Sequence, residues 1–228
     1  MSDDVELVIL DDANEVAAAV AERLARAARA GGNIALTGGR TPEQAYEDAA
    51  RREPDWSETE IWWSDERCVP PGDDLSNYAL AKRALLDRLE REPRALHRIK
   101  GELGKEKAAA DYERELGDTV FDLELLGIGK DGHVASLFPN APTLHERKRV
   151  LPAAPGLEPF VDRVTLSIPV LNSAREIVFA VSGADKADAA RRAFATQPGP
   201  ETPASLVRAR NGSTIAILDR AAAATLRA

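Results

Sequence analysis

An aspartate and a histidine in one glycine-rich turn are the residues of this sequence best suited to move a proton. Asp131 and His133 are separated by a single glycine within LLGIGKDGHVASLFP, residues Leu125 to Pro139. A neutral imidazole has an ordinary pKa of about 6.5, so it can take a proton from water at neutral pH when a carboxylate orients its ring. A histidine that is hydrogen-bonded for structural reasons would give the same local pattern. The pair is therefore a candidate general base with its partner.

The same stretch also contains G-x-G-x-x-G, at Gly127, Gly129 and Gly132, which is the pattern of a dinucleotide-binding loop. That fingerprint should lie in the first βαβ unit, open a helix directly and precede an acidic residue that ends a second strand. Here it lies past the midpoint of the chain, and the region about twenty residues later, VLPAAPG, is expected to be a proline-rich loop. A dehydrogenase is therefore disfavoured, and we expect these glycines to serve the turn.

Two earlier loops could bind an anion. LTGGRTP, Leu36 to Pro42, joins paired glycines to a helix start, where free backbone N–H groups suit a phosphate. Its candidate donors are Thr37, Gly38, Gly39, Arg40 and Thr41. In WWSDERCVPP, Arg67 follows Asp65 and Glu66 and could bind a phosphate or a developing oxyanion. An ordinary capped turn in the first loop and a solvated ion pair in the second remain open as alternatives.

Two later basic residues could serve the same anion. Arg163 enters a predicted strand in DRVTLSIPVLNSA, and Lys186 lies at a helix start after the apolar strand IVFAVS. A lysine at that position opposes the helix dipole, so a bound anion would give it a role there. An exposed lysine is the alternative. His97 and His145 have no comparable setting and are expected to be structural or exposed.

Composition limits the classes of partner and location. The chain has 228 residues, of which 44% are hydrophobic and 30% charged, as in a soluble globular protein, and we expect one domain over residues 1–228. Its net charge of −8 argues against nucleic acid or an anionic membrane as the main partner. From the acidic start MSDDVELVIL we expect no secretory signal, and no apolar run approaches the roughly twenty residues of a membrane span. Its one cysteine, Cys68, excludes an internal disulfide, is expected to be a packing residue and fits a reducing cytoplasm.

Strands that alternate with helices predict the α/β class. The expected strands are Glu6–Leu10, Asn33–Thr37, Glu60–Trp63, Asp122–Leu126, Arg163–Leu166, Glu176–Val181 and Thr214–Leu218. Two helices are expected to start at the capping boxes Asp12–Glu15 and Thr41–Gln44, with Pro42 as the first helical residue of the second. Three further helices are expected over Tyr78–Leu89, Lys105–Leu116 and Ala184–Phe194. This order predicts a mostly parallel sheet with helices on both faces, and ligands bind such sheets at the carboxyl ends of the strands.

These stretches, in this order, resemble the 6-phosphogluconolactonase family. The matching segments are LTGGRTP, WWSDERCVP with SNY, DLELLGIGKDGHVASLFP, RVTLSIPVLNSA, SGADKA and PAS, over residues 36 to 205. The resemblance implies a NagB/RpiA/CoA-transferase-like fold, which is a modified Rossmann arrangement. It also implies hydrolysis of 6-phospho-D-glucono-1,5-lactone in the oxidative pentose phosphate pathway. The ligand would be a small-molecule sugar-phosphate lactone, without metal or organic cofactor. Apart from the resemblance, we expect a monomer or weak homo-oligomer.

The resemblance also assigns roles to residues. His133 matches the family's base and Asp131 its partner, while Arg67 matches the arginine of the DER motif. The glycine loop, Arg163 and Lys186 match groups around the phosphate and sugar, and Asp65 and Asn77 fall within the matched substrate-binding stretches. In two places the chain departs from the family: Arg40 stands where serine is frequent, and Val134 where threonine is usual.

Two related functions fit less well. Glucosamine-6-phosphate deaminases share the D-G-H loop, but they carry a glutamate five residues after the histidine, where this chain has Phe138. Phenylalanine cannot ionise, so deamination is disfavoured. A sugar-phosphate-sensing effector domain would need a DNA-binding segment, and we expect no spare helix-turn-helix region or basic extension in this sequence.

Overall fold

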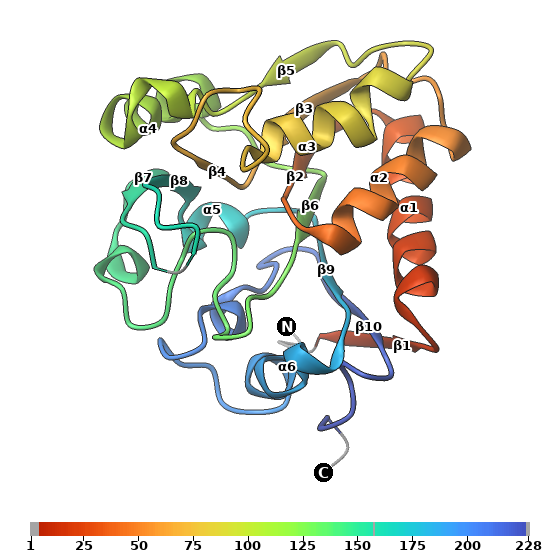
Figure 1. Ribbon diagram of the computed structural model, residues 1–228, viewed down its shortest axis with the longest axis vertical. Helices are drawn as coiled ribbons and strands as arrows, with labels where there is room; N and C mark the ends of the chain where they lie inside the picture. Colours follow the sequence, from red (N-terminus) through yellow and green to blue (C-terminus); the bar gives the residue numbers. More distant parts are fainter. Residues whose placement is uncertain (1–4, 157, 227–228) are drawn as a thin grey trace.

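A seven-stranded parallel sheet forms the centre of the computed structural model, which describes residues 5–156 and 158–226 (Figure 1). The strand order is β1-β10-β9-β6-β2-β3-β5, and every pairing between neighbours is parallel. In that order the strands are Glu6–Leu10, Ser213–Asp219, Glu176–Val181, Leu123–Leu126, Gly32–Leu36, Thr59–Trp63 and Ala95–His97. The predicted parallel sheet is confirmed, with β5 as a strand that the sequence did not indicate.

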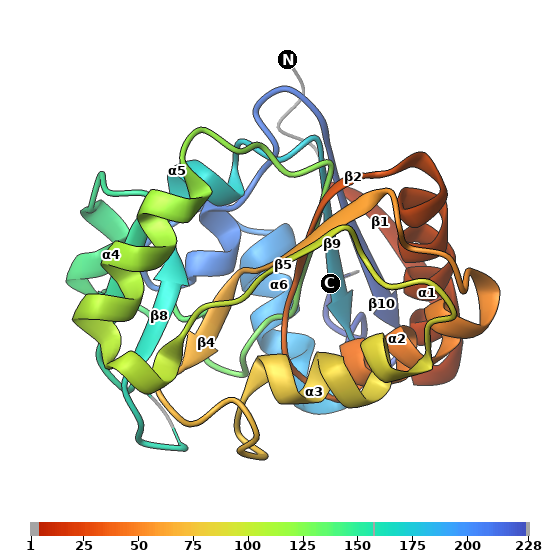
Figure 2. The same cartoon turned by 90° about the horizontal axis from the view of Figure 1, so that it is seen from above.

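Helices cover both faces of this sheet. In Figure 2, α1 and α2 lie on one side, whereas α4, α5 and α6 lie on the other. The α-helices are α1 Ala13–Ala30, α2 Arg40–Arg52, α3 Asn77–Ala84, α4 Lys105–Leu116, α5 Ile168–Leu171 and α6 Ala187–Phe194. The 3₁₀ turns are η1 Leu86–Arg88, η2 Gly101–Leu103, η3 Pro142–His145, η4 Ala184–Lys186 and η5 Pro203–Leu206. No helix in residues 5–156 or 158–226 is long and apolar enough to cross a membrane.

A second, three-stranded sheet lies beside the first. Its strands are β4 Asp65–Arg67, β8 Arg163–Leu166 and β7 Val150–Ala153, paired antiparallel with β8 in the middle. The prediction of a loop over VLPAAPG was therefore wrong for its first four residues. Pro152 is compatible with a strand here because β7 is an edge strand, where a missing N–H need not cost a ladder bond.

The helix starts were predicted with mixed success. Asp12 caps α1 by accepting from the N–H groups of Asn14 and Glu15, as its capping box indicates. The second capping box was wrong: α2 begins at Arg40, and its cap is Gly39. Gly39 has φ 115°, a backbone conformation that glycine adopts more readily than residues with a side chain, and the helix begins directly after it. The hydroxyl of Thr41 therefore makes no capping bond.

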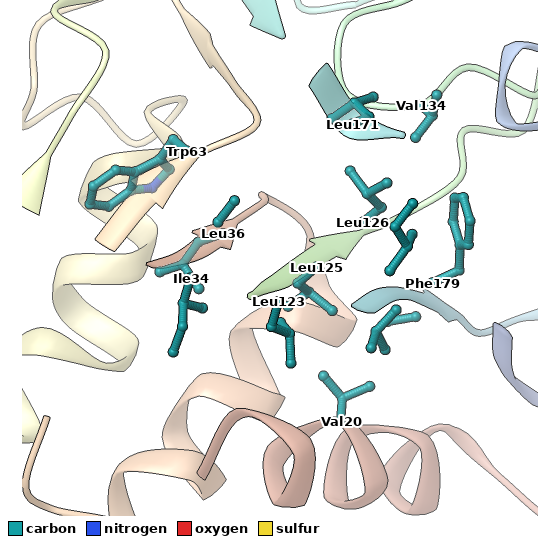
Figure 3. Close-up of a cluster of buried hydrophobic side chains, with 14 of the residues drawn as sticks. Val20, Ile34, Leu36, Trp63, Leu123, Leu125, Leu126, Val134, Leu171 and Phe179 are labelled. Atoms are coloured by element: carbon teal, nitrogen blue, oxygen red, sulfur yellow. The ribbon is translucent and has the colours of Figure 1, made fainter. Parts of the chain in front are cut away.

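The core fixes the strand ends from which the site is built. Figure 3 shows apolar side chains of α1, β2, β3, β6 and β9 packed together, among them Val20, Leu36 and Phe179. Val134, in the turn after β6, belongs to the same cluster and is fully buried. Burial of such a side chain contributes about 1.5–3 kcal/mol. The turn that carries His133 is therefore attached to the core immediately after the histidine.

Candidate active site

Most of the predicted site residues meet in one cavity at the carboxyl ends of the central strands. This small cavity has a volume of about 200 Å³. Nine of the twelve predicted residues line it: Thr37, Gly38, Gly39, Asp65, Arg67, Asn77, His133, Arg163 and Lys186. Asp131, Arg40 and Thr41 do not. The residues come from loops that are far apart in the sequence, as the parallel sheet requires.

A larger cavity of about 580 Å³ adjoins the small one. The two share Gly38, Gly39, Gly127, Ile128 and Lys186 as a common wall. Arg40 and Thr41 line only the larger cavity, so the glycine loop separates them from His133. Arg40 is exposed, and its guanidinium makes no hydrogen bond or ion pair with the described residues.

The proposed proton-transfer pair is in direct contact. Nδ1 of His133 lies 2.6 Å from Oδ1 of Asp131, and the same oxygen accepts the backbone N–H of His133 at 3.1 Å. Partial burial raises the pKa of Asp131, but the hydrogen bonds and charge of His133 more than offset this, so the net pKa is lowered. Asp131 is thus a carboxylate at neutral pH, and its contact with Nδ1 leaves Nε2 of His133, a residue of the cavity lining, without this partner.

Gly129 makes this pairing possible. A Cβ at position 129 would lie 2.0 Å from Nδ1 of His133 and 2.6 Å from Oδ1 of Asp131. The turn is closed by Gly129 N–H donating to the His133 carbonyl at 2.9 Å. Gly129 of the G-x-G-x-x-G pattern therefore serves the turn, as predicted, because the side chains of the pair fold back against its backbone.

Arg67 and Arg163 are paired on the neighbouring strands β4 and β8 of the second sheet. The antiparallel register of β4 and β8 places the two arginines directly opposite, an arrangement of like charges that destabilises a sheet unless something compensates. In each, the Nε atom is buried without a hydrogen-bond partner. Burial first, and then the charge of Arg67, lower the pKa of Arg163. Two adjacent guanidinium groups with unused donors form a strong potential anion site.

Asp65 and Asn77 support the opposite wall. Both oxygens of Asp65 are used, because Asn77 Nδ2 donates to one at 3.0 Å and Ser136 Oγ to the other at 2.6 Å. Asn77 Oδ1 is buried without a partner, and a Cβ on Gly38 would lie 2.0 Å from it. Gly38 is therefore required by its close packing against the side chain of Asn77. The sequence does not indicate Ser136 as a site residue, since nothing in ASLFP distinguishes this serine from an ordinary loop residue.

Glu66 is a structural residue. Its carboxylate accepts the N–H groups of Arg67, Asn77 and Tyr78 and the hydroxyl of Ser76, and so holds the start of α3. Burial raises its pKa and these four bonds oppose the rise. A group with this many donors directed at it is poorly placed to act as a base.

Lys186 projects from η4 into the wall shared by the two cavities. Its pKa is lowered, chiefly by burial. Its neighbour Asp185 is paired instead with Lys130, at 3.1 Å. The ammonium of Lys186 makes no hydrogen bond or ion pair within residues 5–156 and 158–226. A half-buried ammonium without a partner is a suitable contact for an anionic ligand.

The remaining histidines and the cysteine lie outside this arrangement, as expected. The ring of His97 stacks on Trp62 with centroids 3.8 Å apart and lies between Glu60 and Glu115. His145 is exposed. Burial, followed by nearby negative charge, raises the pKa of Cys68 to about 11, which disfavours a reactive thiolate. Within the described residues, no group of three or more His, Cys, Asp or Glu side chains could hold a metal ion.

Comparisons with known proteins cover the whole range in which these residues lie. A family model for glucosamine-6-phosphate isomerases/6-phosphogluconolactonase matches residues 10–216. A 6-phosphogluconolactonase of Streptomyces coelicolor is 36% identical over 99% of this chain and 96% of its own length. The solved 6-phosphogluconolactonase of Thermotoga maritima has a TM-score of 0.84 at 30% identity, covering 94% of this chain and 99% of that one. A monomeric glucosamine-6-phosphate deaminase of the NagB superfamily shares the fold, with a TM-score of 0.82 at 22% identity and 98% and 100% coverage.

Proposed function

The chain belongs to the family of glucosamine-6-phosphate isomerases and 6-phosphogluconolactonases, and from this we propose that it hydrolyses 6-phospho-D-glucono-1,5-lactone to 6-phospho-D-gluconate. The reaction belongs to the oxidative pentose phosphate pathway. The observation that carries the proposal is the convergence of the His133–Asp131 pair with three cations, Arg67, Arg163 and Lys186, around one cavity. We infer that this arrangement supplies a base for water and a site for phosphate, the two functions that this hydrolysis needs.

In the proposed mechanism, His133 activates a water molecule. As the water oxygen bonds to C1 of the lactone, its proton passes to Nε2 of His133 and the carbonyl electron pair moves onto the carbonyl oxygen. Collapse of this tetrahedral species breaks the bond between C1 and the ring oxygen. The imidazolium returns its proton to that ring oxygen, and the new carboxylic acid ionises in water. A general base of this kind contributes roughly 10²–10⁴ in rate.

The cations divide between the two ends of the substrate. We assign Lys186, Arg163 and the Gly38–Gly39 loop to the phosphate, and Arg67 to the region of the reacting carbonyl. The unused Nε donors of both arginines and the unpartnered ammonium of Lys186 support this assignment. Binding energy from the phosphate, which does not react, orients C1 against the water.

Phe138 supports hydrolysis over deamination. It occupies the position at which the deaminases carry glutamate, and it is buried, with its ring centroid 5.0 Å from that of His133. The guanidinium of Arg163 lies over the same ring at 5.6 Å. An apolar ring there supplies no second proton-transfer group beside His133.

The test is acid release from freshly prepared 6-phosphogluconolactone, followed at constant pH with spontaneous hydrolysis subtracted. Unphosphorylated gluconolactone is the comparison substrate, and the variant H133Q is the matched protein control. We expect acceleration of the phosphorylated lactone by the wild type, a much lower kcat/KM for the unphosphorylated one, and little acceleration by H133Q. Hydrolysis of the phosphorylated lactone at its spontaneous rate would refute the proposal.

A further inference from the structure

Arg192 of α6 contacts the backbone of the turn that carries Asp131 and His133. Its Nη1 donates to the carbonyl oxygen of Asp131 at 3.2 Å, and its Nη2 to that of Lys130 at 3.4 Å. These are the two successive carbonyls between Gly129 and Gly132. The planar fork of a guanidinium can serve two neighbouring acceptors at once, which a lysine ammonium cannot do in the same geometry.

The guanidinium is itself fixed from two further directions. Its Nε donates to Asp188, one turn earlier in α6, at 2.8 Å, and its Nη1 donates to the hydroxyl of Thr202 at 2.6 Å. Only 25% of the Arg192 side chain is exposed. Contacts in several directions restrict the rotamers of this long side chain, so it can act as a rigid support for the turn.

The segment from Gly199 to Ser205 completes the support from the other side. The N–H of Ala204 donates to the carbonyl of Gly132 at 3.0 Å, and Ser205 Oγ donates to the Thr202 carbonyl at 2.6 Å. Gly132 has φ 95°, and a Cβ there would lie 2.9 Å from Thr202 Cγ2 and 3.1 Å from Arg192 Nη1. The PAS stretch, for which the sequence predicts no role, therefore holds the turn together with Arg192.

We propose that Arg192 is a positioning residue for the hydrolysis: by holding the Lys130 and Asp131 carbonyls, it fixes the turn that presents His133 to the substrate. This inference rests on the proposed function. The turn needs such support because glycine occupies two of its four positions from residue 129 to residue 132, and glycine loses the most conformational freedom on ordering. A displacement of a reacting group by about 1 Å can cost about 10² in rate.

Arg192 lines neither cavity, whereas Lys186 lines both. Lys186 lies in η4, which leads directly into α6, so one helical segment supplies a cation to the proposed phosphate site and a support to the turn with the base. Loss of Arg192 should therefore impair the chemical step while the contacts to the phosphate remain. That separation distinguishes a positioning residue from a binding residue.

The first experiment compares R192A, R192K and R191A in the lactone assay. Arg191 is the matched control because it lies on the same helix and pairs with the same Asp188, at 3.0 Å, but makes no recorded bond to the turn. For R192A we expect a 10- to 100-fold fall in kcat and a dissociation constant for 6-phosphogluconate within about twofold of the wild type, following the cost of misplacement above. R192K should recover part of the loss, R191A should match the wild type, and millimolar guanidinium should partly restore R192A but not H133Q.

A second measurement does not depend on activity. The ring nitrogen-15 NMR signals of His133, assigned by their absence from H133Q, should shift in R192A while those of His97 stay in place. A wild type that lacks lactonase activity would refute the proposed function. The NMR signals of His133 would then be the remaining test of whether Arg192 positions the turn. The positioning role is overturned if R192A keeps wild-type kcat and unchanged His133 signals. It is equally overturned if R191A loses as much activity as R192A, or if product binding weakens as much as kcat falls.

Discussion

Nδ1 of His133 lies 2.6 Å from Oδ1 of Asp131, across a turn in which Gly129 has no side chain to separate them. A carboxylate accepts hydrogen bonds only, so Nδ1 carries the proton of the neutral ring and the lone pair lies on Nε2. The lowered pKa of Asp131 keeps this carboxylate charged at neutral pH. The tautomer required for a general base is therefore set by the contact.

The first prediction concerns the base. H133Q should lower kcat by about 10² or more, because a glutamine amide cannot take a proton from water. Binding of 6-phosphogluconate should persist, since the proposed phosphate contacts come from other loops. The measurements are background-corrected initial rates and calorimetric titration with the product. Near wild-type turnover of H133Q at pH 7 would exclude the proposed mechanism.

The second prediction concerns the space behind the pair. G129A should lower kcat by about tenfold or more, because the added methyl would have to displace either the imidazole or the carboxylate. The control is G72A, since a Cβ at exposed Gly72 meets no atom within 4 Å. Initial rates and thermal unfolding of both variants separate a site effect from general destabilisation. Equal kcat for the two variants would show that the turn can absorb the methyl group.

Local turn chemistry could be predicted from the sequence, whereas long-range pairings could not. Paired glycines before a helix indicated an anion-binding loop, and the D-G-H turn indicated a proton-transfer pair. Each of these patterns lies within a few adjacent residues. The opposition of Arg67 and Arg163 depends on a three-residue strand that pairs with a segment almost a hundred positions later. Nothing near Arg67 encodes that register, so the sequence indicated two separate cations and missed the second sheet that joins them.

Arg192 illustrates a second limit. Within DKADAARRAF, adjacent arginines on a helix are typical of a solvated face, and Arg191 and Arg192 look equivalent. Only the packing of α6 against the turn distinguishes them.

The error at Thr41 is of another kind. Threonine followed by proline is a sound helix start, but Gly39, two residues before Thr41, adopts a positive φ and takes the cap position instead.

The third prediction concerns the phosphate. K186A should raise KM for the phosphorylated lactone by about tenfold and change kcat little, because a charge contact distant from C1 stabilises ground and transition states alike. The control is K107A, which removes one exposed positive charge from α4. Steady-state kinetics with both lactones provide the measurement. An unchanged KM for the phosphorylated lactone would remove Lys186 from the site.

The fourth prediction concerns metals. Dialysis against EDTA should leave kcat and KM unchanged, because the mechanism assigns both water activation and charge stabilisation to side chains. The same rates are measured before dialysis, after dialysis and after addition of Zn²⁺ or Mg²⁺. Loss of activity on dialysis with recovery on addition of a divalent ion would contradict this.

The fifth prediction concerns Glu124, which is fully buried in β6. Ser64 Oγ lies 2.6 Å from Glu124 Oε1 and 3.0 Å from the Leu36 carbonyl oxygen, and one hydroxyl proton cannot serve both acceptors. A protonated Glu124 resolves this, because it donates to Ser64, which then donates to Leu36. Burial first, with a smaller contribution from the charge of Asp65, raises the pKa of Glu124 to about 8, against an opposing hydrogen bond from Ser64.

The folded protein therefore keeps a proton on Glu124 that the unfolded chain releases above its ordinary pKa of 4.5. The stabilisation from this group is complete below 4.5 and is lost as pH rises through the window to about 8, at up to about 1.4 kcal/mol per pH unit. E124Q carries no ionisable group there, so its free energy of unfolding relative to the wild type should increase from about pH 5 to about pH 8. Urea denaturation of both proteins across this range provides the measurement, and Asp131, with its lowered pKa, titrates below it. A constant difference between E124Q and the wild type over this range would show that Glu124 is ionised in the folded protein at neutral pH.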